Sequence, residues 1–266
     1  MTTKGQDQNY LRNDQYKNST NLSARRQLNA RFTTNPYSWF KWVFDQFEGP
    51  SNAHVLELGA GPAWLWSENA ERIPHGWQIT VSDFSPGMVT EERQNLQSIE
   101  HPFDLAIIDA QSIPYEISMF DTVIANHMLH HVPDLTQALS EIKRVLKPTG
   151  KLYAATNGQR HMHELYELVL NYGREQLGGS GNSSFTLEKG QKDLAQFFQN
   201  ITIRRYEDAL EITEVEPLVA YILSGGQFSE DIRGQSADFH EYVKRAFGDS
   251  GSFHITKDVG LFIASL

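Results

Sequence analysis

The sequence predicts an α/β fold in which a mostly parallel β-sheet is covered by helices on both faces. Between residues 54 and 156, short apolar strands alternate with helical patterns, and this alternation favours parallel strands joined by helices. The chain has 266 residues, of which 39% are hydrophobic, so it can bury a sizeable core. We therefore expect one α/β domain with a modest cap.

The chain before the first strand predicts a helical cap over residues 1–48. Residues 1–21 are polar, and we expect them to begin as disordered chain. Residues 22–47 are rich in aromatic side chains and contain two helical patterns, which Asn35 and Pro36 interrupt. The cap is either a helical cover for one end of the sheet or a lid that brings side chains to a substrate pocket, namely Tyr16, Arg31 and Trp39.

The first strand leads into a turn that is typical of ligand-binding loops. Residues 54–66 read HVLELGAGPAWLW: an apolar strand that contains Glu57, then two glycines around an alanine, then the start of a helix. Glycine lets the backbone approach a ligand closely, and the start of a helix presents unpaired N–H groups. This pattern predicts that a cofactor binds at the turn.

The residues around the turn indicate which cofactor binds there. A dinucleotide fingerprint, G-x-G-x-x-G, has a glycine where this chain has Trp64, so the pattern disfavours a nicotinamide-dependent dehydrogenase. Glu57 instead suits a cofactor that carries an ammonium group and no phosphate. We therefore predict that the cofactor is S-adenosylmethionine.

Acidic residues also end or follow the second and third strands. Asp83 ends the second strand, 24 residues beyond Gly59, where a carboxylate can accept hydrogen bonds from both hydroxyls of a ribose. Asp109 follows the third strand, and we expect it to receive the amino group of adenine, with the N–H of Ala110 facing a ring nitrogen. Three strand ends therefore predict one cofactor site.

The remaining elements are predicted from the same patterns. After the first strand, we expect strands at 77–83, 103–108, 120–125, 151–156, 201–206 and 253–264. Helices are expected at 62–69, 135–146, 161–177, 187–199, 214–223 and 237–247, with a flexible loop at 178–184. Within the main domain, residues 49–266, the segments at roughly 160–200 and 208–250 have the length of insertions that shape a pocket.

Three histidines follow the fourth strand, namely His127, His130 and His131. Their spacing can form a metal site on a helix, but the chain has no cysteine to assist, and a strand-to-helix connection points only one or two of them inward. We therefore predict no metal site. His131 either acts as a general base on the acceptor or only bonds a backbone carbonyl at the helix entry. His161 and His163 are further candidates for the same cleft.

Five motifs in order resemble one family. The segments HVLELGAGP, TVSDFSPGM, IIDAQSIPY, FDTVIANHMLHHVPD and EIKRVLKPTGKLY resemble the class I S-adenosylmethionine-dependent methyltransferases, in particular the small-molecule group with a type 11 methyltransferase domain. The resemblance covers roughly residues 53–157. It implies a Rossmann-like sheet of seven strands in the order 3-2-1-4-5-7-6, with the last strand antiparallel. One departure is Ala63, where many members have a third glycine.

The resemblance also implies roles for individual residues. The cofactor would be held at its methionine end by Glu57, Gly59, Ala60, Gly61 and the carbonyl of Asn126, at its ribose by Asp83, and at its adenine by Phe84, Met88, Asp109, Ala110 and Gln111. His131 resembles the histidine that many members point into the substrate pocket. We therefore take His131 and then His127 as candidate catalytic residues, with His130 in the substrate pocket.

Charge and composition limit the partners. A net charge of −10 argues against nucleic acid and anionic membranes, and no apolar run approaches the length that spans a bilayer. The absence of cysteine removes disulfides and thiolate metal sites, and it fits a reducing cytoplasm. We expect a cytoplasmic monomer or homodimer.

The expected reaction is methyl transfer from S-adenosylmethionine to a small-molecule acceptor by in-line displacement. The methyl group of a sulfonium is already activated, so the protein has to hold the acceptor in line, exclude water and remove a proton where the acceptor is acidic. The alternative is a non-catalytic module that binds S-adenosylmethionine or S-adenosylhomocysteine.

Overall fold

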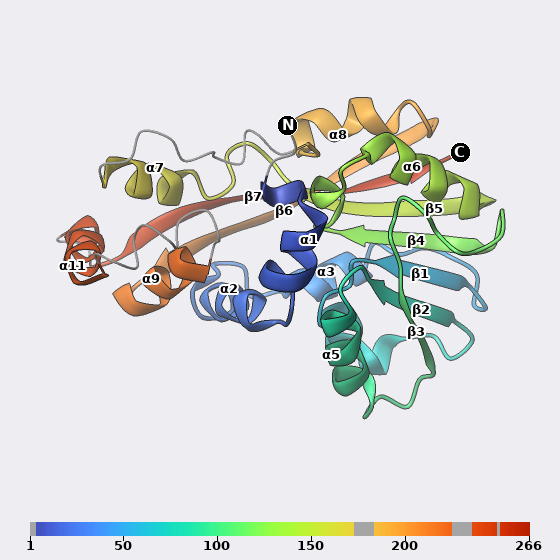
Figure 1. The fold of residues 1–266 in the computed structure, drawn as a ribbon, viewed down its shortest axis with the longest axis horizontal. Helices are drawn as coiled ribbons and strands as arrows, with labels where there is room; N and C mark the ends of the chain where they lie inside the picture. Colours follow the sequence, from blue (N-terminus) through green and yellow to red (C-terminus); the bar gives the residue numbers. More distant parts are fainter. Residues whose placement is uncertain (1–3, 173–183, 225–235, 249–250) are drawn as a thin grey trace.

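A computed structural model describes residues 4–172, 184–224, 236–248 and 251–266 (Figure 1). Within these ranges the chain forms a seven-stranded sheet in the order β3-β2-β1-β4-β5-β7-β6. The strands are β1 His54–Leu58, β2 Gln78–Asp83, β3 Phe103–Ile107, β4 Phe120–Asn126, β5 Leu146–Asn157, β6 Asn200–Ile212 and β7 Phe253–Ser265. Strands β1 to β5 pair in parallel, and β7 runs antiparallel to both β5 and β6. The predicted fold class and strand order are confirmed.

Helices surround this sheet, and the chain begins with a helical cap. The described helices are α1 Gln8–Tyr10, α2 Thr20–Phe32, α3 Trp39–Phe44, α4 Trp64–Glu68, α5 Pro86–Leu96, α6 Leu135–Val145, α7 His163–Asn171, α8 Leu187–Leu194, α9 Val215–Ser224 and α11 Ser236–Ala246. None of these described helices is both long and apolar enough to cross a bilayer.

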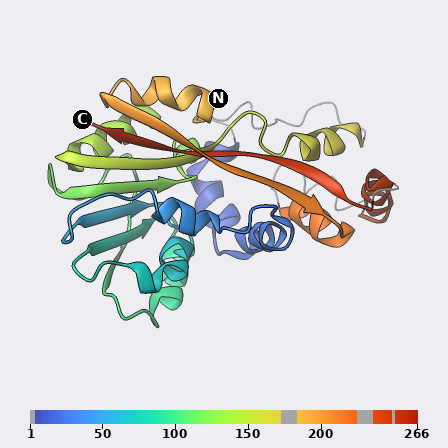
Figure 2. The same cartoon turned by 180° about the vertical axis from the view of Figure 1, so that it is seen from behind.

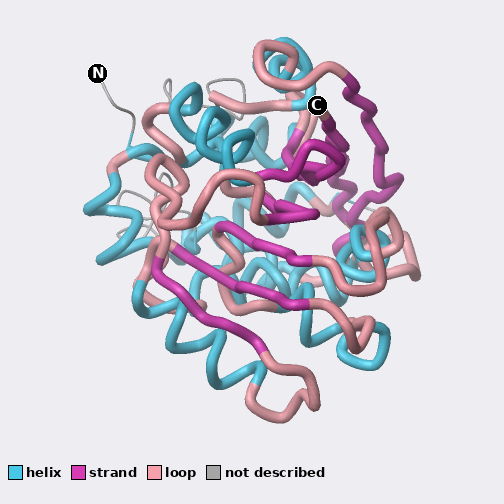
Figure 3. The backbone as a smooth tube through the Cα atoms, turned by 90° about the vertical axis from the view of Figure 1, so that its right-hand side faces the viewer, coloured by secondary structure: helices cyan, strands magenta, loops and turns pink. Residues whose placement is uncertain are grey.

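The central strands place alternate residues in the two layers of the main core, one layer on each face of the sheet. Figure 3 shows the backbone of these strands and of the helices around them. Leu56 and Val123 pack on one face with residues of α6 and α8, whereas Val55 and Ile124 pack on the other face with residues of α3, α4 and α5. A strand turns successive side chains to opposite faces, so both faces of these buried strands must be apolar. Helices thus cover both faces of the sheet, and a ligand can bind at the carboxyl ends of β1, β2 and β4.

Strands β6 and β7 are longer than the expected strands 201–206 and 253–264. They pair along all 13 residues of β6 and continue beyond the sheet as a ribbon (Figure 2). Residues of α2, α7, α9 and α11 pack on the extension in a second core, around Leu210 and Ile255. The charged run RRYED in the middle of β6 hides the alternating pattern of this strand, so the sequence did not predict its second half.

Two expected helices are shorter in the structure. The helix expected at 161–177 is α7, which ends at Asn171, and residues 173–177 with most of the expected loop 178–184 lie outside the described residues. The helix expected at 187–199 is α8, which ends at Leu194 because the next turn folds Phe198 into the core of the sheet.

Residues 1–21 were expected to begin disordered, and this expectation is wrong from residue 4 onward. Helical turns cover Lys4–Gln6, Gln8–Tyr10 and Leu11–Gln15. Leu11 is buried, the side-chain amide of Gln6 donates to the carbonyl of Val132, and that of Gln8 donates to Asp109. A polar segment can be ordered when a distant surface satisfies its hydrogen bonds, which local composition does not reveal.

Candidate functional site

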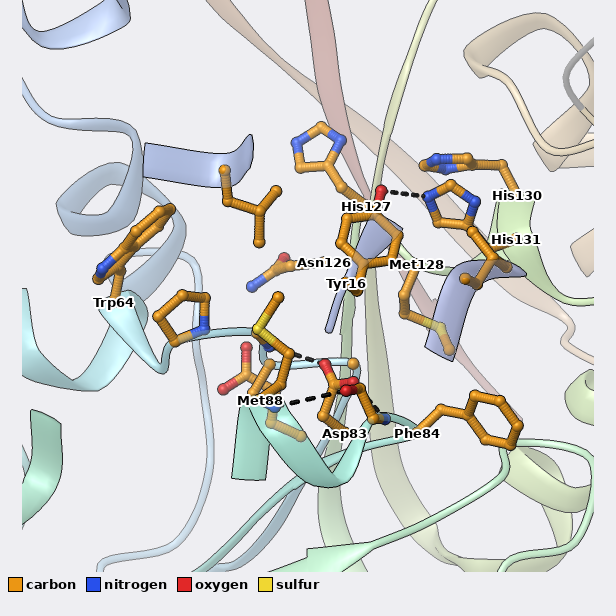
Figure 4. Close-up of a pocket in the computed structure, with 18 of the residues that line it drawn as sticks. Tyr16, Trp64, Asp83, Phe84, Met88, Asn126, His127, Met128, His130 and His131 are labelled. Atoms are coloured by element: carbon orange, nitrogen blue, oxygen red, sulfur yellow. Dashed lines mark hydrogen bonds between the residues drawn. The ribbon is translucent and has the colours of Figure 1, made fainter. Parts of the chain in front are cut away.

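One cavity of about 470 Å³ lies at the carboxyl ends of the central strands, under the N-terminal cap (Figure 4). This volume is typical of small-molecule sites, and the position between β1 and β4 is where open α/β sheets bind their ligands. The cavity is lined by all of the cofactor-binding candidates from the sequence: Glu57, Gly59, Ala60, Gly61, Asp83, Phe84, Met88, Asp109, Ala110, Gln111 and Asn126.

The glycine turn after β1 has a backbone that requires small residues. Gly59 and Gly61 have φ angles of 65° and 57°, a region that residues with a Cβ rarely adopt. A Cβ on Gly59 would also lie 2.6 Å from the Cβ of Met128. Ala63 has a φ of 58° as well, so the position where many relatives have glycine keeps the left-handed conformation here, at a cost of about 1 kcal/mol.

Asp83 joins the glycine turn to the end of β2. Its two carboxylate oxygens accept hydrogen bonds from the backbone N–H groups of Gly61, at 2.9 Å, and Ser85, at 2.8 Å. Burial raises the pKa of Asp83, while these N–H groups oppose the shift. Each oxygen retains a second lone pair, so the carboxylate can also accept a ligand's hydroxyl groups.

Glu57 and Asn126 supply buried polar groups beside the turn. Glu57 Oε2 accepts a hydrogen bond from the indole N–H of Trp66 at 2.6 Å, and burial raises the pKa of Glu57 to about 8. Both polar atoms of the Asn126 amide are buried and lack a well-formed hydrogen bond among the described residues, although the amide lies close enough to Glu57 to lower its pKa. Buried polar atoms are rarely left without partners, so this amide fits a ligand with both donor and acceptor groups.

The loop after β3 is held by its own side chains and by the cap. Asp109 accepts hydrogen bonds from the N–H of Gln111, at 2.9 Å, and from the side chain of Gln8, at 3.2 Å. The side chain of Gln111 joins Asp109 to the N–H of Asp134. Gln111 therefore orders the loop as well as lining the cavity.

The cap brings Tyr16 and Trp39 to the cavity, as the lid interpretation predicted, but not Arg31. Arg31, which the sequence assigned to the substrate pocket, is exposed, forms an ion pair with Glu214 and is not among the residues that line the cavity. Arg25 lines the cavity instead. Leu28 of the same helix is fully buried in the second core, so the helix has one buried face and one cavity face. The sequence of this helix has almost no amphipathic pattern, so neither this division nor the arginine that faces inward was readable from the sequence.

His131 and Tyr16 form a half-buried hydrogen-bonded pair (Figure 4). His131 Nδ1 lies 2.8 Å from the carbonyl oxygen of Gly5, and a carbonyl only accepts hydrogen bonds, so Nδ1 carries the proton. Nε2 therefore accepts the hydrogen bond from the Tyr16 hydroxyl, at 2.9 Å. Burial lowers the pKa of His131, which keeps the imidazole neutral near pH 7.

The other histidines divide into cavity and surface groups. His127, His130 and His161 line the cavity, whereas His163 is exposed beside Glu167. Burial lowers the pKa of His127 to about 4 and that of His161 to about 3, and it lowers the pKa of His130 well below the usual value. The described residues contain no cluster of three or more potential metal-ligating side chains.

Comparisons with known proteins agree with this geometry. Residues 56–154 match the family model described as a methyltransferase domain. The chain is 31% identical over 137 residues to a demethylmenaquinone methyltransferase from Staphylococcus epidermidis, an alignment that covers 50% of this chain and 56% of that protein. The chain thus spans about half the length of this curated relative.

Two solved structures share the fold over most of this chain. The [4+2]-cyclase SpnF is 17% identical with a TM-score of 0.58, covering 94% of this chain and 93% of that one. The second is a Haemonchus contortus phosphoethanolamine N-methyltransferase, solved in complex with phosphomonomethylethanolamine and S-adenosylhomocysteine. It is 18% identical with a TM-score of 0.55, and the match covers 99% of this chain and 60% of that one. Both likenesses concern the fold. From the domain match, the curated relative and the strand order, residues 56–154 form a methyltransferase domain of the class I, S-adenosylmethionine-dependent type.

Proposed function

We propose that this protein transfers the methyl group of S-adenosylmethionine to a small-molecule acceptor. The observation that carries the proposal is one cavity that is lined both by the carboxylates of Glu57 and Asp83 with the amide of Asn126 and by the Tyr16–His131 pair. The cofactor, when bound, supplies a methyl group that is already activated as a sulfonium. The name of the quinone-methylating relative supports a small molecule as the acceptor.

The residues at the turn fit the cofactor. Glu57 and Asn126 would hold its amino-acid end, and a bound ammonium would favour the ionised form of Glu57. Asp83 would hold the ribose hydroxyls. The backbone at Gly59 to Gly61 leaves room for close approach, and the adenine would lie among the group formed by Phe84, Met88, Asp109, Ala110 and Gln111.

The Tyr16–His131 pair is placed to remove a proton from an acceptor hydroxyl or amine. The acceptor's proton would pass to the oxygen of Tyr16 while the proton of Tyr16 passes to His131 Nε2. The resulting imidazolium keeps its Nδ1–H bond to the carbonyl of Gly5. His131 would thus act through Tyr16, which extends the proposal that His131 is the base.

The test is methyl transfer to the small-molecule fraction of an extract from the source cells, with methyl-labelled cofactor. A labelled product is expected with the wild-type protein. Binding of S-adenosylhomocysteine without any labelled product would favour the alternative, a non-catalytic binding module. Cytoplasmic location and a monomeric or homodimeric state remain predictions to be tested beside this one.

Removing the Asp83 carboxylate is expected to weaken cofactor binding. Asp83→Ala should cost about 2 kcal/mol of binding free energy, or roughly 30-fold in the Kd of S-adenosylhomocysteine, because hydrogen bonds to a charged group are lost. Titration calorimetry measures the change, with Asp104→Ala as a control because Asp104 is exposed on β3. Equal affinity for Asp83→Ala and the wild type would contradict the ribose assignment.

We propose that residues 1–48 act as a lid on the domain formed by residues 49–266. Gln6, Gln8 and Tyr16 bond to groups of the main domain, so cofactor binding beneath them should stabilise these contacts. Amides of α1 and α2 should exchange hydrogen more slowly when S-adenosylhomocysteine is bound, while those of α11, which lies away from the cavity, should not change. Unchanged exchange in α2 would make the segment a static cover.

A further inference from the structure

We call the part of the cavity at Tyr16 and His131, where the methyl acceptor would bind, the acceptor end. It contains a cation that has no carboxylate partner in the described part of the chain. Four cationic side chains line the cavity: Arg12, Arg25, Arg26 and Lys257. Arg26 pairs with Glu68 at 2.9 Å, and Lys257 pairs with Asp208 at 2.6 Å. Arg12 is exposed and lies 5.6 Å from the ring of Phe84, at the adenine end. Arg25 is half-buried, and none of the ion pairs among the described residues includes it.

The position of Arg25 follows from how α2 packs. Leu28 and Phe32, four residues apart, face the second core, whereas Leu22, Arg25 and Asn29 share the face that lines the cavity. Leu22 lies over the glycine turn, 3.5 Å from where a Cβ of Gly61 would be. Arg25 lies one helical turn after Leu22. Its side chain therefore lies beyond the glycine turn, at the part of the cavity that Tyr221 of α9 also lines.

The charge of Arg25 shifts the pKa values of groups at the acceptor end. The guanidinium lowers the pKa of Tyr16 against the effect of burial, and it adds to the burial that lowers the pKa of His130 and His131. The shifts of Glu57 and Asp83, at the cofactor end, have other causes. Arg25 thus stands beside the proposed proton acceptors, and its charge does not contribute to the pKa shifts of Glu57 and Asp83.

We propose that Arg25 binds an oxyanion of the methyl acceptor, which is therefore a small molecule with a carboxylate, phosphate or similar group ionised at neutral pH. This inference rests on the proposed function. A guanidinium presents donors in a planar fork that matches such an oxyanion, and a partly desolvated cation without a counter-charge is costly until an anion neutralises it. Binding of the anion also turns the acceptor's other end toward Tyr16.

The experiment separates the small molecules of the source extract on an anion exchanger at pH 8 and assays each fraction with methyl-labelled cofactor. The acceptor is expected in the retained fraction. With that fraction, Arg25→Gln should raise the KM by roughly 10- to 100-fold with a smaller change in kcat, and Arg25→Lys should recover part of the loss. Arg31→Gln, on the exposed side of the same helix, is the matched control and should behave as the wild type.

Three outcomes would overturn the inference. An acceptor in the unretained fraction, with a KM that Arg25→Gln does not change, removes the oxyanion. A tenfold or larger rise in the Kd of S-adenosylhomocysteine in Arg25→Gln, with an unchanged acceptor KM, assigns the guanidinium to the carboxylate of the cofactor. If no fraction accepts methyl although S-adenosylhomocysteine binds, the proposed function itself fails, and this inference with it. The melting temperature of each variant is measured as a control, so that kinetic constants are compared only between folded proteins.

Discussion

Tyr16→Phe should lower methyl transfer by roughly 10²-fold or more while leaving the affinity for S-adenosylhomocysteine unchanged. The substitution removes only the hydroxyl that donates to His131 Nε2 at 2.9 Å, so the proposed path of the proton is cut while the ring remains. General acid–base groups contribute about 10²- to 10⁴-fold. His131→Ala should give a loss of the same order, because both residues belong to one path. Steady-state kinetics and calorimetry on the same samples measure both quantities.

The matched control removes another hydroxyl from the cap. Tyr10 donates to Gln15 and does not line the cavity, so Tyr10→Phe should keep the wild-type rate. If His131→Ala instead lowers the melting temperature but keeps the rate per folded molecule, then the histidine is structural, held by the carbonyl of Gly5. Methyl transfer would then rest on proximity and orientation alone.

The pH dependence of methyl transfer follows from the same pair. Only a neutral His131 can receive a proton, and burial holds its pKa below the ordinary value of about 6.5. Activity should therefore persist as the pH falls to 6.5 and decline only below it.

Glu92→Gln should raise the free energy of unfolding at pH 7 by about 3 kcal/mol. Glu92 is fully buried in α5, and both of its carboxyl oxygens lack hydrogen-bond partners among the described residues. Burial, together with the negative charges of Asp83 and Glu57, raises its pKa to about 9. The folded protein thus holds a proton at pH 7 that the unfolded chain releases above pH 4.5. The stability contributed by this group is complete below pH 4.5 and is lost as the pH rises toward 9.

Comparison of two pH values isolates this effect. One pKa unit corresponds to about 1.36 kcal/mol, and glutamine does not titrate, so Glu92→Gln should differ from the wild type at pH 7 and hardly at all at pH 4. Urea unfolding at both pH values measures the difference, and the exposed Glu71→Gln should show none. A gain that is equal at both pH values would mean that the Glu92 carboxyl does not hold its proton in the folded protein.

The sequence alone was sufficient for the first five strands and for the residues that end them. Glu57, Asp83 and Asp109 were identified because each stands at or just beyond a short apolar strand, and parallel strands open at one edge of a sheet. The glycine turn was equally visible, because only small residues adopt its backbone without strain. Each of these signals lies within a single short segment of the chain, so local chemistry determines it.

Tertiary structure alone decided the acceptor end of the cavity. Tyr16 and His131 are 115 residues apart, and nothing local to either residue indicates that one donates to the other. The choice of Arg25 over Arg31 likewise depends on which face of α2 packs on the second core, which in turn depends on the long extension of β6 and β7. Contacts of this kind form only when surfaces from distant segments satisfy each other's polar groups and bury each other's apolar ones, so they are properties of the packed chain and not of any one segment of it.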